Sequence, residues 1–303
     1  MSKKKIISII WNISLFIILL YFSNFNQLKE TFFKINLIYL ILGAILSITF
    51  VLITALRWED LLSKLNTSFQ RNKKLFIIAS HKKEFFSSFT SNLVGDIYAI
   101  FKIKGATKVD LTYSLLITKY FDFFIVSVIA IASLILLRFL NKLYGILIIL
   151  LLLIFLIKIE YFLKWLIGII NKISWDKLRL FNDLRILRNQ EVTKAIIIRL
   201  LTFTVFLWLI RLSVTFFTFK SLNYLTSISQ LLFITFIPII ASLVAFILPK
   251  SVSGDSMTVI LGVVVGINYN ILIIYVLIHR IYSLIISGVG IILDLFINQR
   301  SVK

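Results

Sequence analysis

Six long apolar runs divide the chain, and they restrict its fold more than any other feature of the sequence. The runs cover residues 6–22, 35–56, 111–137, 143–159, 195–219 and 270–297. A helix needs about 20 apolar residues to cross the hydrocarbon core of a bilayer. Because 60% of the residues are hydrophobic and only 15% are charged, water would solvate the surface poorly. The sequence therefore predicts an all-α polytopic membrane protein with about six full spans.

Two further apolar segments, 75–103 and 230–268, are interrupted by polar and small residues. The first contains Asn92 and the pair Gly95-Asp96, and the second contains the polar stretch 249–255. Irregular backbone at membrane depth is tolerated only where protein buries it or where it lines a wet cavity. We therefore expect two re-entrant or broken helical segments. The alternatives are one rather polar span for the first segment and two full spans for the second.

The domain organisation is simple, because no Pro/Gly/Ser-rich linker interrupts the apolar pattern. We expect residues 1–303 to form a single transmembrane domain. The run at 6–22 follows three lysines and precedes no small-residue cleavage site, which favours an uncleaved first span. A signal peptide is the second interpretation of this run.

The net charge of +20 suggests nucleic acid as a partner, but the basic residues flank the apolar runs. The positive-inside rule and anionic lipid head groups explain that placement better. Connections rich in Lys and Arg, at 1–5, 57–74 and 158–194, alternate with connections that contain fewer basic residues, around 29–34, 138–142 and 220. This alternation predicts that both termini are cytoplasmic and that the protein is a multi-pass protein of the cell membrane. We expect no nucleic-acid partner.

The sequence does not contain the residues that several kinds of catalytic and metal-binding chemistry require. The chain has no cysteine, and its two histidines, His81 and His279, are isolated from each other. No phosphate-binding glycine loop, nucleophile–base pair or acidic metal motif is present. We therefore expect no cofactor and no metal, and we favour a non-enzymatic role. A membrane-embedded enzyme that uses Asp96 or Asp255 is the remaining enzymatic hypothesis.

Charged residues within the apolar segments are the candidates for function, because an ionised group at the bilayer centre costs about 2.5–3.5 kcal/mol. Lys119 and Asp122 are three residues apart on one helical face and could neutralise each other. Alternatively, Lys119, Arg211 and Arg280 line a polar cavity that takes a phosphate, since a guanidinium matches phosphate oxygens bidentately. Arg199 and Asp294 lie near the ends of apolar runs, where side chains reach water.

Similar landmarks recur in the two halves of the chain. Gly95-Asp96 matches Gly254-Asp255, and Lys119 matches Arg280 at a similar offset. The matching segments, 35–137 and 195–297, are predicted to cross the membrane in opposite directions. This is the pattern of inverted repeats in transporters, with broken helices that meet near the midplane. Coincidence is the alternative explanation.

In this order, the landmarks resemble the lysylphosphatidylglycerol synthase transmembrane family, also called the flippase-like family, over about residues 5–297. The segments that carry the resemblance are Arg57-Trp58 with Leu61-Leu62, Asn92, Gly95-Asp96, Lys119 with Asp122, Pro249-Lys250-Ser251, Gly254 and Arg280. The chain departs from the family pattern around the first glycine, where a proline and an arginine are usual. It also lacks the glutamate that usually follows the second glycine turn.

The resemblance implies a flippase-like protein that binds or translocates an anionic phospholipid or a lipid-linked sugar. A non-transporting membrane partner of a glycosyltransferase or lipid-modifying enzyme is the alternative. No lysyl-transferase domain is present in the 303 residues, so we expect no aminoacyl transfer to lipid. The predicted substrate-binding residues are Asn92, Gly95, Asp96, Lys119, Asp122, Arg211, Lys250, Ser251, Gly254, Asp255 and Arg280. The expected partners are membrane lipids, either anionic or linked through polyprenyl phosphate.

Overall fold

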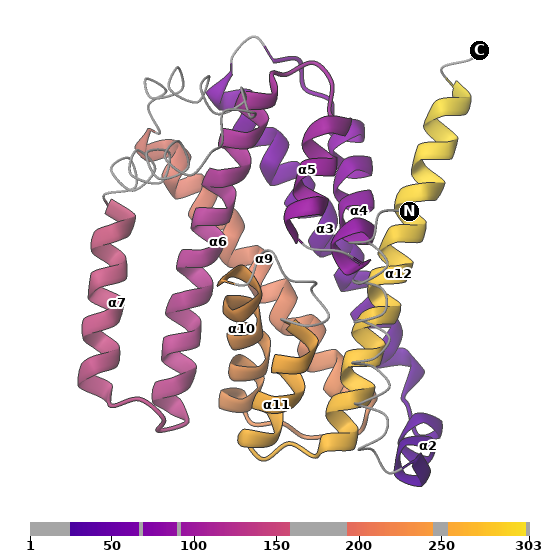
Figure 1. The fold of residues 1–303 in the computed structure, drawn as a ribbon, viewed down its shortest axis with the longest axis vertical. Coiled ribbons are helices and arrows are strands. Elements are labelled where there is room, and N and C mark those ends of the chain that lie inside the picture. Colours follow the sequence, from indigo (N-terminus) through magenta and orange to yellow (C-terminus); the bar gives the residue numbers. More distant parts are fainter. Residues whose placement is uncertain (1–24, 67–68, 90–91, 158–192, 245–253, 301–303) are drawn as a thin grey trace, which may run out of the picture.

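The computed structural model describes residues 25–66, 69–89, 92–157, 193–244 and 254–300, and within them the chain forms helices and no strand. The ten helices are α2 (Phe25–Phe33), α3 (Leu37–Leu65), α4 (Lys73–Phe89), α5 (Asn92–Lys102), α6 (Lys108–Leu136), α7 (Lys142–Ile157), α9 (Lys194–Ser221), α10 (Ile228–Val244), α11 (Ser256–Val264) and α12 (Tyr269–Arg300). Figure 1 shows them as one bundle of long and short helices. The prediction of an all-helical chain is confirmed.

Four of the described helices, α3, α6, α9 and α12, are long and apolar enough to cross a membrane. Helix α7 is strongly apolar after Lys142, and the structure describes 16 residues of it. The predicted first run at 6–22 lies outside the described residues. The polytopic character follows from the four long helices, whereas the total of six spans stays a prediction.

Helices α3 and α9 form an antiparallel central pair, and polar caps define their ends. Asn36 caps α3 through its side chain, and Thr193 caps α9 in the same way. The backbone N–H of Asn36 donates to the carbonyl of Ser221 at 2.8 Å, so the start of α3 lies against the end of α9. At the opposite end of the pair, Arg199 of α9 contacts Asp60 of α3 at 2.8 Å.

Each of the two interrupted segments consists of two helices that pack against each other, not of one straight helix. The segment at 75–103 forms α4 and α5, and the segment at 230–268 forms α10 and α11. In Figure 1 the α4–α5 pair enters the bundle from the upper end and the α10–α11 pair from the lower end. The inner ends of both pairs lie near mid-height in this view.

The contacts between helices follow the same scheme in both halves of the chain. Helix α4 packs against α12, and its counterpart α10 packs against α6. Helices α3 and α6 are in contact, as are α9 and α12; α5 touches α6, and α11 touches α12. The contacts among these helices are therefore reproduced when α3, α4, α5 and α6 are exchanged for α9, α10, α11 and α12, respectively. Helices α3 and α9 form the pair at the centre of this pattern.

The end of α3 differs from the sequence prediction. Residues from 57 onward were assigned to a basic connection, but α3 continues to Leu65 and buries Arg57, Trp58 and Glu59. The helix continues because Leu61 and Leu62 extend the apolar face of Trp58 at helical spacing. The basic residues at 81–83, within the first interrupted segment, lie inside α4.

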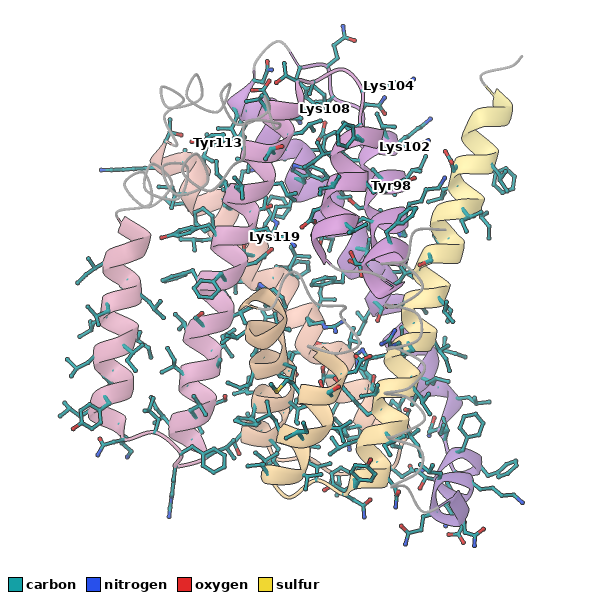
Figure 2. All side chains as sticks on the ribbon, viewed as in Figure 1. Tyr98, Lys102, Lys104, Lys108, Tyr113 and Lys119 are labelled. Carbon is teal, nitrogen blue, oxygen red and sulfur yellow. The ribbon has the colours of Figure 1, made fainter. Side chains whose placement is uncertain are left out.

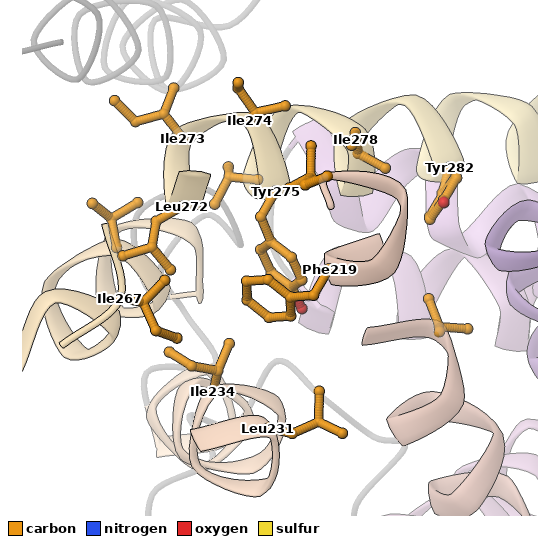
Figure 3. Packing of buried hydrophobic residues seen from close by; sticks show 14 of the residues in the cluster. Phe219, Leu231, Ile234, Ile267, Leu272, Ile273, Ile274, Tyr275, Ile278 and Tyr282 are labelled. Atoms are coloured by element: carbon orange, nitrogen blue, oxygen red, sulfur yellow. The ribbon is translucent and has the colours of Figure 1, made fainter. Parts of the chain in front are cut away.

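The largest described core joins α9, α10, α11 and α12. The ring of Phe219 stacks on that of Tyr275 with 4.8 Å between centroids (Figure 3). Leu231, Ile234 and Leu272 close the same cluster from α10 and α12. This apolar packing holds the lower half of the bundle together around the α10–α11 pair.

The interface between α4 and α12 is unusually close at Gly290. A methyl group at this position would lie 2.6 Å from the β-carbon of His81 and 3.3 Å from the backbone at residues 81 and 82. One turn further along α12, Asp294 forms an ion pair with Lys82 of α4. Gly288, on another face of α12, has no atom of the described residues within 4 Å of such a methyl group.

We predict that Gly290→Ala destabilises the protein by about 1–3 kcal/mol, because the added methyl overpacks a contact with rigid atoms. Gly288→Ala is the matched control, since the same change in the same helix meets none of the described residues and improves helix propensity by about 1 kcal/mol. Thermal unfolding in detergent, followed by size-exclusion chromatography, measures both. Equal midpoints for the two variants would contradict the close α4–α12 contact.

Candidate functional site

A cavity of about 240 Å³, lined by charged and apolar side chains, lies where the two short helical pairs meet the long helices. Its lining comes from α3, α4, α6, α9, α10, α12 and the residues that begin α11. The described basic residues of the lining are Arg57, Lys83, Lys119, Arg211 and Arg280, and the acidic ones are Glu84, Asp122 and Asp255. Intramembrane ionisable residues commonly mark binding sites or ion pathways, so this cavity is the candidate site.

Arg57 is the most deeply buried cation of the cavity, with 2% of its side chain exposed. Its two terminal nitrogens donate to the two carboxylate oxygens of Asp122 on α6, each at 2.8 Å. One of them also donates to the hydroxyl of Thr204 on α9 at 2.8 Å. Arg57 therefore joins α3 to α6 through a bidentate ion pair, which is the strongest geometry for such a contact, and to α9 through a hydrogen bond.

Of the two alternatives for Lys119 and Asp122, the described ion pairs do not show the one in which these two residues pair with each other. Asp122 is taken by Arg57, and Lys119 lies 3.3 Å from Asp96 of α5. The two residues do share a face of α6, but neighbouring helices supply better partners than one turn of the same helix does. A planar guanidinium engages both carboxylate oxygens at once, which a single ammonium cannot do.

Asp96 receives two ammonium groups, one from each side. The amine of Lys83 on α4 lies at 2.5 Å, and that of Lys119 on α6 lies at 3.3 Å. Gly95 permits this geometry, because a methyl group there would lie 2.1 Å from the Ser87 hydroxyl oxygen and 2.8 Å from the Lys83 carbonyl oxygen. Figure 2 places Lys119 at mid-height in the bundle, well below Lys102 and its neighbours at the upper end.

The second half of the chain builds an equivalent pair. Asp255, at the start of α11, accepts from Arg280 of α12 at 2.5 and 2.6 Å. In each half, a Gly-Asp pair thus contacts a cation of the last long helix in that half. The sequence comparison that matched Lys119 with Arg280 therefore has a counterpart in the geometry.

Arg211 differs from the other cations of the cavity. It lies within α9 and lines the cavity, yet it makes no ion pair and no side-chain hydrogen bond with any residue in the described ranges. One turn along α9, the hydroxyl of Thr215 lies 3.2 Å from that of Tyr275. Both of these hydroxyl-bearing residues also line the cavity.

Most of the predicted site residues in the described ranges meet in this cavity or in its ion pairs. Lys119, Asp122, Arg211, Gly254, Asp255 and Arg280 line it, and Asp96 pairs with two of its lysines. Gly95 supports the α4–α5 contact, and Asn92 is the first residue of α5. Lys250 and Ser251 lie outside the described residues.

Three charged residues of the lining were missed: Arg57, Lys83 and Glu84. Arg57 was recognised only as part of an Arg-Trp motif and counted as a loop charge. Its position one residue before Trp58, in an unbroken helical pattern, was the signal that could have placed it inside α3. Lys83 and Glu84 stand within the apolar segment 75–103, where unmatched charges likewise indicate a polar interior.

Long apolar helices around a buried, charged cavity define a polytopic integral membrane protein. The family model that matches is the lysylphosphatidylglycerol synthase TM region, over residues 9–290. Since the match covers most of the chain, the protein belongs to this family. No curated protein and no solved structure matched the chain.

We predict that Arg57→Gln lowers the free energy of unfolding by about 3–5 kcal/mol, because it leaves the Asp122 carboxylate buried without its partner. The double variant Arg57→Gln with Asp122→Asn should recover much of this loss, since neither remaining group is charged. Arg199→Gln is the control: Arg199 is 49% exposed and pairs with Asp60, so its loss costs about 0–1 kcal/mol. Unfolding titrations in mixed micelles measure all three, and additive effects would refute the pairing.

Proposed function

We propose that this protein is flippase-like and that it binds or translocates an anionic phospholipid or a lipid-linked sugar. The observation that supports the proposal is the cavity into which both halves of the chain direct cations. Cations buried in a membrane bundle are costly and are typical of substrate or ion pathways. Phosphate is the anionic group common to both lipid classes, and arginine side chains bind it well.

The inverted repeat supports translocation over simple binding. Helices α3 and α9 are antiparallel, the two interrupted segments enter from opposite ends, and the helix contacts repeat after exchange of the halves. In transporters built this way, a site near the midplane is exposed alternately to each side as one repeat rocks against the other. We propose that the α4–α5 and α10–α11 pairs are re-entrant and that the complete chain has six full spans.

The distribution of basic residues supports a cytoplasmic position for the upper end of the bundle. Lys102, Lys104 and Lys108 lie at that end in Figure 2. The loop at 66–72 and the start of α9 add further cations there. The positive-inside rule then orients this end toward the cytoplasm of the cell, and a plasma-membrane location with both termini cytoplasmic is part of the proposal.

Single cysteines test this orientation cleanly, because the chain has none of its own. We predict that a cysteine at Leu225, in the exposed loop before α10, reacts with a membrane-impermeant maleimide in intact cells. A cysteine at Gln70, in the loop before α4, should react only after permeabilisation. The reverse pattern would invert the proposed topology.

Transport in proteoliposomes tests the function itself. The assay follows dithionite bleaching of a fluorescent phosphatidylglycerol, with protein-free vesicles as the blank. We predict that Arg211→Lys and Arg280→Lys each slow the exchange about tenfold or more, because a lysine keeps the charge but loses the planar fork. Arg199→Lys, which changes a cation outside the cavity, should match the unaltered protein.

Two results would contradict the proposal. If lipid exchange is no faster than in protein-free vesicles, the protein does not translocate this lipid. That result would favour the alternative role as a non-transporting partner of a glycosyltransferase or lipid-modifying enzyme. Full activity in both lysine variants would remove the bidentate phosphate contact and leave the arginines a role in helix pairing.

A further inference from the structure

Arg57 borders two spaces in the bundle. It lines the cavity, and it also lines a small notch of about 10 Å³ between α3 and α9. The notch is about as large as the space that one water molecule needs. Its other described charged residues are Asp60, Lys64 and Arg199, which lie toward the upper end of the bundle. The Arg57 side chain therefore lies between the cavity and the end that we propose to be cytoplasmic.

Polar contacts hold Arg57 in this position, and they do not satisfy it completely. The guanidinium makes its two contacts with Asp122 and one hydrogen bond with Thr204. Its Nε atom is buried and has no hydrogen-bond partner among the described residues. A buried donor without an acceptor is unfavourable, so the observed arrangement is less stable than the bidentate contact alone would make it.

Asp122 has a second basic group close by on its own helix. Lys119 lies one turn before it on the same face of α6, and the two residues interact electrostatically. Lys119 contacts Asp96 in the structure, but Asp96 also contacts Lys83 and would keep that partner. Asp122 can therefore leave Arg57 without becoming an isolated buried charge, which lowers the cost of separating the ion pair.

The lower end of the cavity is closed by apolar packing instead. The rings of Phe219 and Tyr275 stack there, within the largest described core (Figure 3). The position on α12 that corresponds to Asp122 carries Ser283, three residues after Arg280. Opening an apolar core exposes apolar surface to water, whereas separated ions are hydrated again. The polar contact at Arg57 is therefore the one that is suited to open.

We propose that the Arg57–Asp122 ion pair is a gate between the cavity and the cytoplasmic leaflet, and that a lipid head group enters the cavity when this pair separates. This inference rests on the proposed function and adds the side from which the cavity is loaded. The phosphate of the entering head group replaces Asp122 at the guanidinium, since the planar fork of an arginine binds either anion bidentately. Asp122 turns to Lys119 at the same step.

A cysteine on the far side of the gate reports its opening, because the chain has no cysteine of its own. Ser47 is suitable, since it lines the cavity and is 4% exposed. Residue 47 lies about 15 Å below residue 57 along α3, at a rise of about 1.5 Å per residue. The measurement is the rate at which Ser47→Cys in the full-length protein reacts with the anionic, membrane-impermeant methanethiosulfonate MTSES. Inside-out vesicles present the cytoplasmic face to the reagent, and intact cells present the outer face.

The double variant Arg57→Gln with Asp122→Asn removes both charges of the gate. In this background we expect Ser47→Cys to react about tenfold faster in inside-out vesicles and at an unchanged rate in intact cells, as a buried pair of charges commonly contributes this much. Arg57→Lys keeps the charge but loses the planar fork, and should give a smaller increase of about threefold. Asp60→Asn with Arg199→Gln is the matched control, because it removes another Asp–Arg pair of α3 and should leave the rate unchanged.

The outcomes do not depend on the transport assay. If the folded double variant shows no faster reaction in inside-out vesicles, or a faster one only in intact cells, the gate is wrong and the proposed function stands. Equal acceleration in the Asp60 and Arg199 control would also overturn the gate, since it would show a general loosening of the bundle. If the double variant does not fold, an unchanged rate in Arg57→Lys overturns the gate. The expected rates without any lipid exchange above the protein-free blank would support the gate and contradict the proposed translocation of this lipid.

Discussion

The burial of charge inside an apolar bundle is the constraint on which the rest of this structure depends. Arg57 reaches a position with 2% exposure because Asp122 and Thr204 receive its donors from two other long helices. Lipid cannot supply such partners, so the three helices must stay together for any of them to hold these residues. The same contacts leave a polar space at the centre of the bundle instead of a dry core.

The two short helical pairs extend this principle to both ends of the bundle. Each brings an aspartate beside a glycine to a cation on a long helix, Asp96 to Lys119 and Asp255 to Arg280. The glycine at position 95 lets the backbone of α5 approach α4 more closely than a side chain would allow. Ion pairs and close backbone packing together therefore position the walls of the cavity. Two apolar clusters, one that contains Phe219 and one that contains Trp58, stabilise the helices that carry these walls.

The sequence predicted the helical class, the two interruptions and most of the charged residues of the cavity, but it left open which of these charges pair with each other. Spacing on one helix suggested that Lys119 pairs with Asp122. The actual partners come from α3 and α5, which are far away in sequence. Similarly, Arg57 was assigned to a loop. A hydropathy pattern shows that burying a charge is unfavourable, but it does not show whether a residue remote in sequence neutralises that charge.

The sequence alone determined that this chain belongs in a membrane, because no soluble fold could hide apolar runs of this length and number. It also indicated that two of the apolar segments are interrupted, since each contains polar residues within an otherwise apolar stretch. Only the tertiary structure decided which charges neutralise each other and which described cation, Arg211, remains unmatched. That outcome depends on distances between helices remote in sequence, and Coulombic and hydrogen-bond energies change steeply over those distances.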